Sequence, residues 1–433
     1  MSNQVKQRSV YWRAQLDLFI ASGLGGRIAV LLNLVKKVFT RVIFIVFVVL
    51  VGPVVLCLVV LRPIVVIRFG NLSADRIGMI TLQCSQYLIV RGLENYPVKR
   101  FDVVGVLGPI ANTQFLTMFG RLKAIFPGAW LWALMDTACQ FWSRSKMHHL
   151  ELGYNHSFYP RIAQGKCQFK FNAIELSQGL EMLSRFGVPT ESKWVCLHNR
   201  DSKYLSATLP GDWSYHNYRD FGVMDMLDAA ESFAAGGYIA FRMGSKQSEP
   251  LHQANLKIID YASSSYQSEF MDIYLLAGCE AYFGSDSGIV TVPFVFGKPV
   301  SFINHSLTLL GQIINLSTKV GLPSITKHLV NTKSGRPIGL RGMFAAGLNW
   351  AASSKDFADA GITIVSNTPL EIRVLADEVI QRLGRSWKVN PQDEELQARF
   401  WRIYCECEGN TDASTIKARI GASFLRQHQY LLE

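Results

Sequence analysis

Hydrophobic and polar positions along the chain switch between short β-branched runs and longer stretches with helical spacing. Residues 64–67 predict a buried strand, which a glycine-containing loop at 68–78 connects to a helix that ends at Leu93. A second unit repeats this order, with a strand at 101–107 and a helix at 112–126. Strands that alternate with helices predict an α/β fold built on parallel sheets.

The same alternation continues into the C-terminal half. Further strands are predicted at 193–197, 238–242, 281–283 and 299–303, and further helices at 130–142, 172–186, 224–235, 270–277 and 368–383. Because 433 residues exceed what one compact core holds, we expect two α/β lobes with a hinge at Gly187-Val188-Pro189. The predicted boundaries are 64–188 for the N-terminal lobe, 189–370 for the C-terminal lobe and 371–433 for C-terminal helices.

The longest apolar run stands near the N-terminus. Residues 42–61 form a stretch of 20 residues without a charge, which is the length of a membrane-crossing helix. Asp17 is the one acid upstream, against a basic group made of Lys6, Arg8, Arg13, Arg27, Lys36, Lys37 and Arg41. These features predict that residues 1–63 are a basic amphipathic and hydrophobic segment that attaches the protein to anionic membrane lipids. A buried helix of a large domain is the alternative for this run.

The orientation of such a segment raises a conflict. The basic cluster places the N-terminus in the cytoplasm, so a single span would put the large C-terminal part outside. Gly52 and Pro53 lie in the middle of the run, and either residue is able to break a helix. We therefore favour a re-entrant or monotopic hairpin that keeps both flanks on the cytoplasmic side.

Charge and cysteine content narrow the class of protein. The formal net charge is +11, and the membrane segment accounts for it, because the basic residues do not form a nucleic-acid reader motif with exposed aromatics. We expect no nucleic-acid partner. The eight cysteines are scattered without zinc spacing, which favours a reducing compartment over a disulfide framework.

The first candidate site is the turn Gly284-Ser285-Asp286-Ser287-Gly288, which follows a predicted strand and precedes an apolar helix. Glycines let the backbone approach a ligand closely, and a helix N-terminus accepts phosphate oxygens. Ligands of α/β proteins bind at the carboxyl end of the sheet, where this turn is expected. The alternative is an ordinary helix start capped by Asp286 or Ser287.

Two more polar loops follow predicted strands of the same lobe. His198-Asn199-Arg200-Asp201-Ser202-Lys203-Tyr204 offers a forked arginine and other donors for a diphosphate, and Arg242-Met243-Gly244 follows the next strand. Solvated turns with local ion pairs are the alternative for both. If the strands are parallel neighbours, the three loops converge on one pocket.

These stretches resemble a family of bacterial glycosyltransferases with a GT-B-like architecture, distantly similar to heptosyltransferases and fucosyltransferases. The resemblance covers about residues 76–383, and its specific stretches are Phe186 to Pro189, Val195 to Tyr204, Arg242 to Gly244, Ile259-Asp260-Tyr261-Ala262, and Ser287-Gly288 with Val292-Pro293. It implies two Rossmann-like lobes, with the nucleotide-sugar donor in the C-terminal lobe and the acceptor in the N-terminal lobe. The sequence departs from the family at Met79, where a histidine often follows Arg-Ile-Gly.

The resemblance implies transfer of a sugar from a nucleotide-sugar donor to a glycan or lipid-linked acceptor in cell-surface polysaccharide synthesis. We expect diphosphate contacts from His198, Arg200, Lys203, Arg242, Gly244, Asp260 and Ser285 to Gly288, with no cofactor and no metal required. Asp75 is the expected general base and Asp201 the second choice; for Asp75, a helix N-cap is an equally good interpretation. The expected location is the cytoplasmic face of the bacterial inner membrane. A GT-B-like epimerase and an inactive membrane-bound scaffold are the competing functions.

Overall fold

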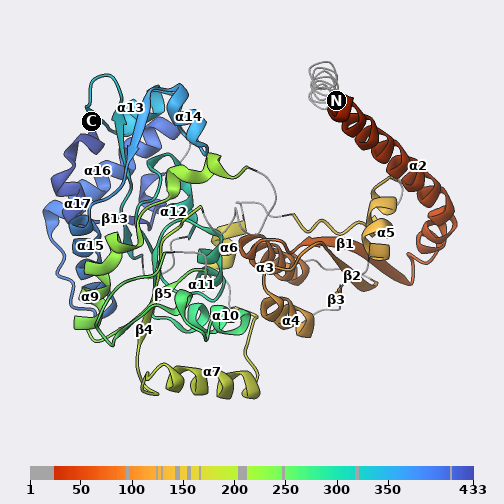
Figure 1. Cartoon of the computed structure of the whole chain (residues 1–433), viewed down its shortest axis with the longest axis horizontal. Coiled ribbons are helices and arrows are strands. Elements are labelled where there is room, and N and C mark those ends of the chain that lie inside the picture. The colour runs from red at the N-terminus through yellow and green to blue at the C-terminus, as the bar shows by residue number, and fades with distance from the viewer. Residues whose placement is uncertain are drawn as a thin grey trace. The chain divides into compact units, whose positions relative to one another are not determined.

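The structure is a computed structural model of the whole chain (Figure 1). It describes residues 24–93, 98–122, 125–127, 130–141, 147–153, 158–164, 167–202, 212–245, 249–316, 321–409 and 412–433. The chain divides into two compact units, a first unit with residues 1–71, 96–106 and 125–151, and a second unit with residues 72–95, 107–124 and 152–433. The predicted lobe boundary at residues 188 and 189 therefore falls inside the second unit.

The first unit holds a three-stranded sheet in the order β1 (Val65–Ser73), β2 (Lys99–Leu107) and β3 (Ile125–Pro127). β2 and β3 run parallel. A buried ion pair joins β1 to β2, because Arg68 Nε donates to Asp102 Oδ1 at 2.7 Å and Arg68 Nη2 donates to Asp102 Oδ2 at 3.0 Å. Both side chains are nearly fully buried, where an unpaired charge would be costly. Each side chain neutralises the charge of the other.

The apolar run near the N-terminus lies in one helix, α2 (Leu24–Val60), which continues through Pro53. The predicted hairpin with a break at Gly52 and Pro53 is therefore wrong, because the helix tolerates the proline. Val51, Val55 and Leu58 pack against α5 (Trp130–Phe141) in a small apolar cluster. Within the described residues, no helix combines the length and the apolar character needed to cross a membrane.

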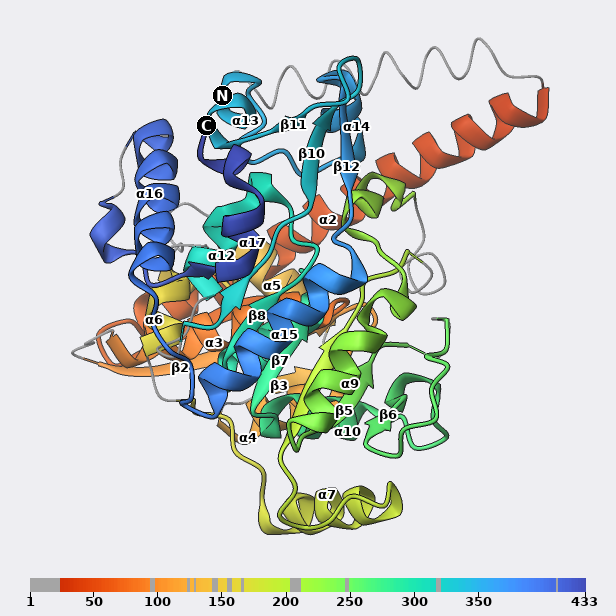
Figure 2. The same cartoon turned by 90° about the vertical axis from the view of Figure 1, so that its left-hand side faces the viewer.

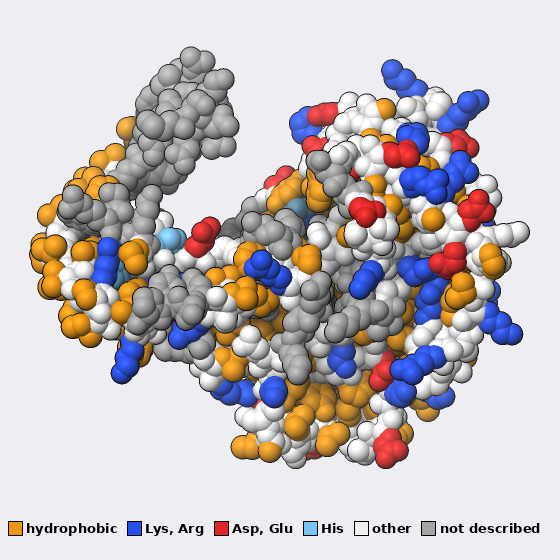
Figure 3. Space-filling model, turned by 180° about the vertical axis from the view of Figure 1, so that it is seen from behind, with side chains coloured by type: hydrophobic (Ala, Val, Ile, Leu, Met, Phe, Trp, Pro, Cys, Tyr) orange, Lys and Arg blue, Asp and Glu red, His pale blue; other side chains and the backbone are white. Residues whose placement is uncertain are grey.

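Much of the apolar surface of α2 is nevertheless exposed. Figure 3 shows hydrophobic side chains gathered on the part of the molecule that carries this helix. The large exposed side chains of this helix and of the turn after it, which we call the α2 apolar face, are Leu31, Leu32, Val35, Val38, Phe39, Val42, Ile45, Val46, Val49, Leu50, Val54, Leu56, Val60, Leu61 and Ile64. Monomeric soluble proteins rarely expose so continuous an apolar surface.

The second unit is built on a five-stranded sheet in the order β6-β5-β4-β7-β8, with every neighbouring pair parallel. The strands are β4 (Trp194–His198), β5 (Ile239–Met243), β6 (Ile258–Ile259), β7 (Ala281–Gly284) and β8 (Val300–Phe302). The α/β fold and the four strands predicted in this half of the chain are thus confirmed. Helices α9 (Leu227–Ala235) and α15 (Pro369–Leu383) pack side by side over the sheet (Figure 2).

Two helices that follow the strands of the first unit belong to the second unit. α3 (Ile77–Leu93) packs against α11 (Thr291–Val295), and α4 (Thr113–Leu122) packs against α10 (Glu269–Gly278). The contact between α3 and α11 includes a hydrogen bond between the hydroxyl groups of Thr81 and Thr291, 2.5 Å apart. The loop before α3, which contains Asp75, is therefore part of the second unit.

The second unit contains further helices, strands and 3-10 turns. They are α6 (Tyr159–Gln164), α7 (Ala173–Arg185), α12 (Leu310–Leu316), α13 (Leu340–Ala345), α14 (Ser354–Asp359), α16 (Pro391–Glu408), α17 (Ala422–Gln427), β9 (Pro323–Ser324), β10 (His328–Asn331), β11 (Pro337–Ile338), β12 (Ile362–Val365) and β13 (Arg419–Ile420), with the 3-10 turns η3 (Ser214–Arg219), η4 (Val223–Met226), η5 (Tyr261–Ser263), η6 (Gly288–Val290), η7 (Leu307–Leu309), η8 (Ala413–Thr415) and η9 (Gln429–Leu432). None of the eight cysteines, all in described segments, forms a disulfide.

Candidate functional site

The three polar loops chosen from the sequence start side by side at the carboxyl edge of the sheet. In the strand register, His198 at the end of β4 pairs with Met243 at the end of β5 and with Gly284 at the end of β7. The loops that follow these three residues therefore leave from one edge, which is where ligands of parallel α/β sheets bind. The convergence of the three loops requires that their strands be parallel neighbours, and this arrangement of the strands is confirmed.

Gly284 is required by strand packing. A Cβ atom at this position would lie 2.4 Å from the carbonyl oxygen of His198, closer than any side chain tolerates. The next residue continues the contact, because the Ser285 amide donates to the His198 carbonyl oxygen at 2.9 Å. The glycine that we selected for close approach to a ligand thus also serves a close approach between β4 and β7.

Gly288 packs against the first turn of α3. A Cβ atom on Gly78 would lie 3.0 Å from the Gly288 Cα, and one on Gly288 would lie 3.2 Å from the Gly78 nitrogen. The helix expected after Gly288 is short, since three residues of 3-10 turn in η6 lead into the five residues of α11. Ser287 forms no side-chain cap bond to this turn. The turn is therefore packed closely against Gly78, and so short a helix contributes little to anion binding at its N-terminus.

Arg200 is a buried cation at the start of the loop after β4. Its Nη1 donates to the carboxylate of Asp220 and to the His216 carbonyl oxygen, the latter at 3.1 Å. Its Nη2 is buried and has no hydrogen-bond partner among the described residues. One half of the guanidinium fork is thus held in place while the other half remains available to an acceptor.

Arg242 and Asp260 form a buried ion pair behind this loop. Arg242 has no exposed surface, and its Nη1 lies 3.2 Å from Asp260 Oδ1 while its Nη2 donates to Asn199 Oδ1 at 3.4 Å. Asp260 also accepts from the Leu251 amide at 2.8 Å. At Gly244, a Cβ atom would lie 3.3 Å from the Ala262 Cβ. These contacts favour a positioning role for Arg242, Gly244 and Asp260, in place of the direct diphosphate contact expected from the sequence.

Sequence reasoning missed several side chains that the structure brings to this edge. The turn η3 supplies His216 and Arg219, and Arg219 Nη1 lies 3.8 Å from Asp286 Oδ2. Lys327, from just before β10, donates to the Asp220 carbonyl oxygen at 2.6 Å. The cluster 215–220, Tyr-His-Asn-Tyr-Arg-Asp, was a visible signal of mixed aromatic and charged residues, whereas nothing in the sequence around Lys327 indicates this role.

The loop after β8 adds a second buried histidine. His305 has no exposed surface, its Nδ1 lies 2.9 Å from the Ser306 carbonyl oxygen, and its Nε2 has no hydrogen-bond partner in the described part of the chain. Gln312 donates to Asp286 Oδ2 at 2.8 Å when its amide nitrogen faces the carboxylate. Asp286 is thereby held between Arg219 and Gln312.

Buried polar atoms without partners gather at this edge. Native proteins satisfy nearly all buried polar groups, so each exception needs an explanation. Within the described residues, the exceptions around the ends of β4, β5 and β7 include Arg200 Nη2, His216 Nδ1, Arg219 Nε, Arg242 Nε, Ser285 Oγ and His305 Nε2. Three of these six atoms are guanidinium donors, so the edge is suited to an anion with several acceptor oxygens.

Burial sets the charge of the histidines in this region. It lowers the pKa of His198 to about 4, despite a hydrogen bond to the Met243 carbonyl oxygen that acts in the opposite direction. Burial, together with Arg219 and Arg200, lowers the pKa of His216 to about 4, and burial lowers the pKa of His305. These rings are neutral at pH 7, so the positive charge of the edge comes from Arg200, Arg219, Arg242 and Lys327.

The two candidate bases lie in different places. Asp75 is half-buried just before α3, makes a 3.7 Å ion pair with Arg76 and has no hydrogen bond to other described residues, so the structure does not show the N-cap that was its alternative role. Arg76 is near enough to His216 to lower the pKa of that ring. Asp201 lies in the loop after β4, near enough to His198 to act on its pKa. Lys203 falls outside the described residues.

Comparisons with known proteins return two solved structures. No family model and no curated protein matches the sequence. The E. coli ADP-heptose LPS heptosyltransferase II is 14% identical over 55% of this chain and 84% of that chain, with a TM-score of 0.34. A family 9 glycosyl transferase from Veillonella parvula is 10% identical over 55% of this chain and 80% of that chain, with a TM-score of 0.30. Both are glycosyltransferases, as is the family that the sequence resembles, but TM-scores below 0.5 leave the function to be argued from the site.

Proposed function

We propose that this chain is a glycosyltransferase that binds the diphosphate of a nucleotide-activated sugar at the carboxyl edge of β4, β5 and β7. The observation that carries the proposal is the pair of buried guanidinium donors, Arg200 Nη2 and Arg219 Nε, which have no hydrogen-bond partner among the described residues. Leaving such donors without acceptors costs free energy, and a diphosphate would supply several oxygens to them. A ligand without acceptor oxygens would leave these donors unpaired.

The proposed chemistry follows from the charge that develops on the leaving group. When the bond between the sugar and the diphosphate breaks, negative charge grows on the departing oxygen, and Arg200, Arg219 and Lys327 are fixed cations that stabilise it. Arg242 and Asp260 act by positioning Asn199 and the loop that carries Arg200. The proposal assigns this stabilisation to protein cations and places no divalent ion and no cofactor at the donor site.

The acceptor hydroxyl needs a base, and we assign that role to Asp75. Its carboxylate lies three residues before Gly78, which contacts Gly288 of the donor turn. No helix cap or buried ion pair occupies it among the described residues, because its ion pair with Arg76 is long and half-exposed. Deprotonation of the acceptor hydroxyl by a carboxylate at this position completes a direct displacement at the sugar carbon.

We also propose that the α2 apolar face binds the cytoplasmic surface of a bacterial inner membrane. The exposed side chains on α2 support this, as do the basic residues of the same N-terminal segment. Nucleotide-activated sugars are made in the cytoplasm, so the donor lobe belongs on that side. A membrane-bound enzyme gains access to a lipid-linked or growing glycan acceptor used in cell-surface polysaccharide synthesis.

Membrane binding predicts a loss of vesicle association when charge is placed on this face. Val49→Lys combined with Leu50→Glu is expected to abolish sedimentation with vesicles that contain anionic lipid, because each side chain is more than 60% exposed and a charge there cannot enter the acyl region. The matched control is Leu256→Lys, which changes an exposed leucine of the second unit. Full vesicle binding by the double variant would contradict the proposal.

Product release separates the proposed transferase from its two competitors. A panel of nucleotide-sugars is incubated with the detergent-purified full chain, with and without a membrane lipid extract from a polysaccharide-producing bacterium. A transferase releases nucleoside diphosphate only with acceptor, an epimerase converts the sugar without releasing it, and a scaffold does neither. Conversion of the sugar without acceptor would replace the proposal with an epimerase.

A further inference from the structure

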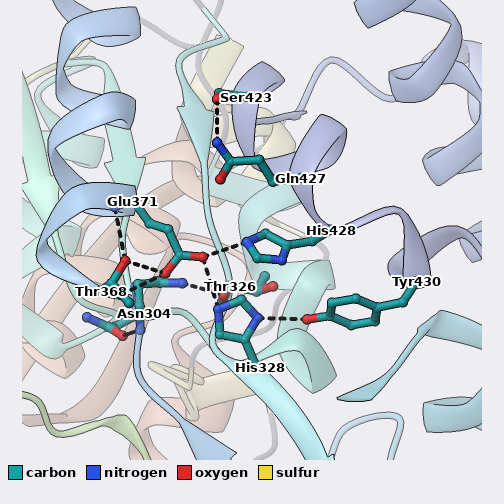
Figure 4. A network of polar contacts seen from close by, with 10 residues as sticks. Asn304, Thr326, His328, Thr368, Glu371, Ser423, Gln427, His428 and Tyr430 are labelled. Carbon is teal, nitrogen blue, oxygen red and sulfur yellow. Dashed lines mark hydrogen bonds and ion pairs between the residues drawn. The ribbon is translucent and has the colours of Figure 1, made fainter. Parts of the chain in front are cut away.

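A cluster of two histidines and a glutamate lies where three distant parts of the chain meet (Figure 4). His328 comes from β10, Glu371 from the first turn of α15, and His428 from the residue after α17. The side chains of His328, Glu371 and His428 are 14%, 9% and 23% exposed. Among the described residues, this is the one group of three such side chains whose ligand atoms all lie within 4.8 Å of one another.

Both imidazole rings point the same atom at the same oxygen. The Nε2 of His328 lies 3.1 Å from Glu371 Oε1, and the Nε2 of His428 lies 2.6 Å from that oxygen. With metal–nitrogen and metal–oxygen bonds of about 2.0–2.1 Å in tetrahedral geometry, ligand atoms are separated by about 3.3 Å. The two contacts therefore need to open by less than an ångström to admit a metal ion between the three atoms.

The outer contacts of the cluster fix its ligands in the orientation that a metal requires. His328 Nδ1 lies 2.7 Å from the Tyr430 hydroxyl, a hydrogen-bond partner that orients the ring with Nε2 toward Glu371. The second oxygen of Glu371 accepts from the Thr368 amide at 2.7 Å and from the Thr368 hydroxyl at 2.9 Å, which directs Oε1 toward the histidines. The Phe424 ring packs against both imidazoles.

We propose that His328, Glu371 and His428 bind one divalent transition-metal ion of the zinc class, which fastens the C-terminal segment 421–433 to β10 and α15. Two imidazole nitrogens and one carboxylate oxygen favour zinc, cobalt or nickel over magnesium and calcium, which prefer all-oxygen sites. Water completes the fourth position. A small pocket lined in part by Glu371, Phe424 and Gln427 lies beside the site.

The metal also braces a segment used by the donor edge. Lys327 directly precedes His328 in the chain and donates to the Asp220 carbonyl oxygen, while its amide donates to the His305 carbonyl oxygen at 2.7 Å. The metal site itself does not depend on the glycosyltransferase proposal. Zinc binding to a chain that binds no nucleoside diphosphate would leave the site intact and remove only this link.

The test is zinc uptake by the chelator-stripped, tag-free full chain, measured by calorimetry and by metal analysis. Wild type is expected to bind one zinc ion per chain and to unfold about 3–6 °C higher with zinc in 100-fold excess over its dissociation constant. His428→Ala is expected to lose both effects. The control His252→Ala changes an exposed histidine of the same unit and is expected to keep both.

Two further readouts separate this site from its alternatives. Cysteines also bind zinc, so the protein is titrated with Co²⁺; the proposal expects a spectrum of nitrogen and oxygen ligands without the intense near-ultraviolet band of thiolates, and expects it to vanish in His428→Ala. Hydrogen exchange of residues 421–433 is expected to slow on adding zinc. The proposal is overturned if His428→Ala takes up as much zinc as wild type, or if His428→Ala lowers the unfolding temperature equally in zinc and in chelator, which identifies a hydrogen-bonded network alone.

Discussion

Asp75→Asn is expected to lower kcat for sugar transfer on the order of 10²–10⁴-fold, because the amide cannot accept the proton of the acceptor hydroxyl. The affinity for nucleoside diphosphate is expected to stay unchanged, since Asp75 makes no contact with Arg200 or Arg219 in the structure. The two quantities are measured on the same preparation, by product release and by calorimetry. A loss of diphosphate affinity equal to the loss of kcat would show that Asp75 holds the donor site together instead.

Two variants make the Asp75 result specific. Asp228→Asn removes an exposed carboxylate on α9 and is expected to leave kcat unchanged. Asp201→Asn tests the second candidate base, which lies in the loop after β4 near His198. If Asp201→Asn abolishes transfer while Asp75→Asn retains it, the base belongs to the donor lobe and our assignment of Asp75 is wrong.

Arg200→Ala is expected to weaken nucleoside-diphosphate binding by about 10–100-fold. A hydrogen bond to a charged group contributes about 1.5–3 kcal/mol, and Arg200 Nη2 is a buried donor without a partner in the described residues. Calorimetric titration measures the change. An affinity equal to that of wild type would exclude Arg200 from the diphosphate site.

The alanine variant leaves Asp220 buried without its cation, so its loss of binding needs controls. Arg200→Lys keeps the charge but loses the fork, and is expected to retain part of the affinity. The double variant Arg200→Ala with Asp220→Asn removes the stranded carboxylate and is expected to bind as weakly as Arg200→Ala. Arg185→Ala, in an exposed ion pair on α7, is expected to bind like wild type.

Local sequence patterns predicted β4, β5, β7 and β8 because each is a mostly apolar run between turn residues, whereas the two-residue strand β6 was not predicted. They also placed His198, Met243 and Gly284 at strand ends, which is where the register puts them. The sheet order β6-β5-β4-β7-β8 could not be predicted from local sequence patterns, because packing between segments far apart in the chain decides which strands are neighbours.

The site predicted from the sequence was incomplete for the same reason. His216, Arg219, His305 and Lys327 reach the edge from loops and turns whose local sequence carries no spacing rule. A glycine in the sequence is also weak evidence for a ligand site, because it indicates that another group approaches the backbone closely but does not identify that group. Gly284 meets the backbone of β4, and Gly288 meets Gly78.

The His328, Glu371 and His428 cluster escaped detection because its members stand 43 and 57 residues apart. Metal sites are found in a sequence only when ligands share a helix face or a short loop. Pro53 is the reverse case, because here a strong local signal predicted a helix break that the structure does not contain. α2 continues through Pro53, and Val51 and Val55, which flank Pro53 in the chain, pack against α5.

The proposed function depends most on binding of a nucleoside diphosphate at the carboxyl edge of β4, β5 and β7. Calorimetric titration of the wild-type chain with UDP, GDP, ADP and CMP measures this directly. We expect saturable binding of one diphosphate that is tighter than binding of the matching monophosphate, and a loss of that difference in Arg200→Ala. Absence of binding by every nucleotide, in a protein that is folded by thermal unfolding, would contradict it.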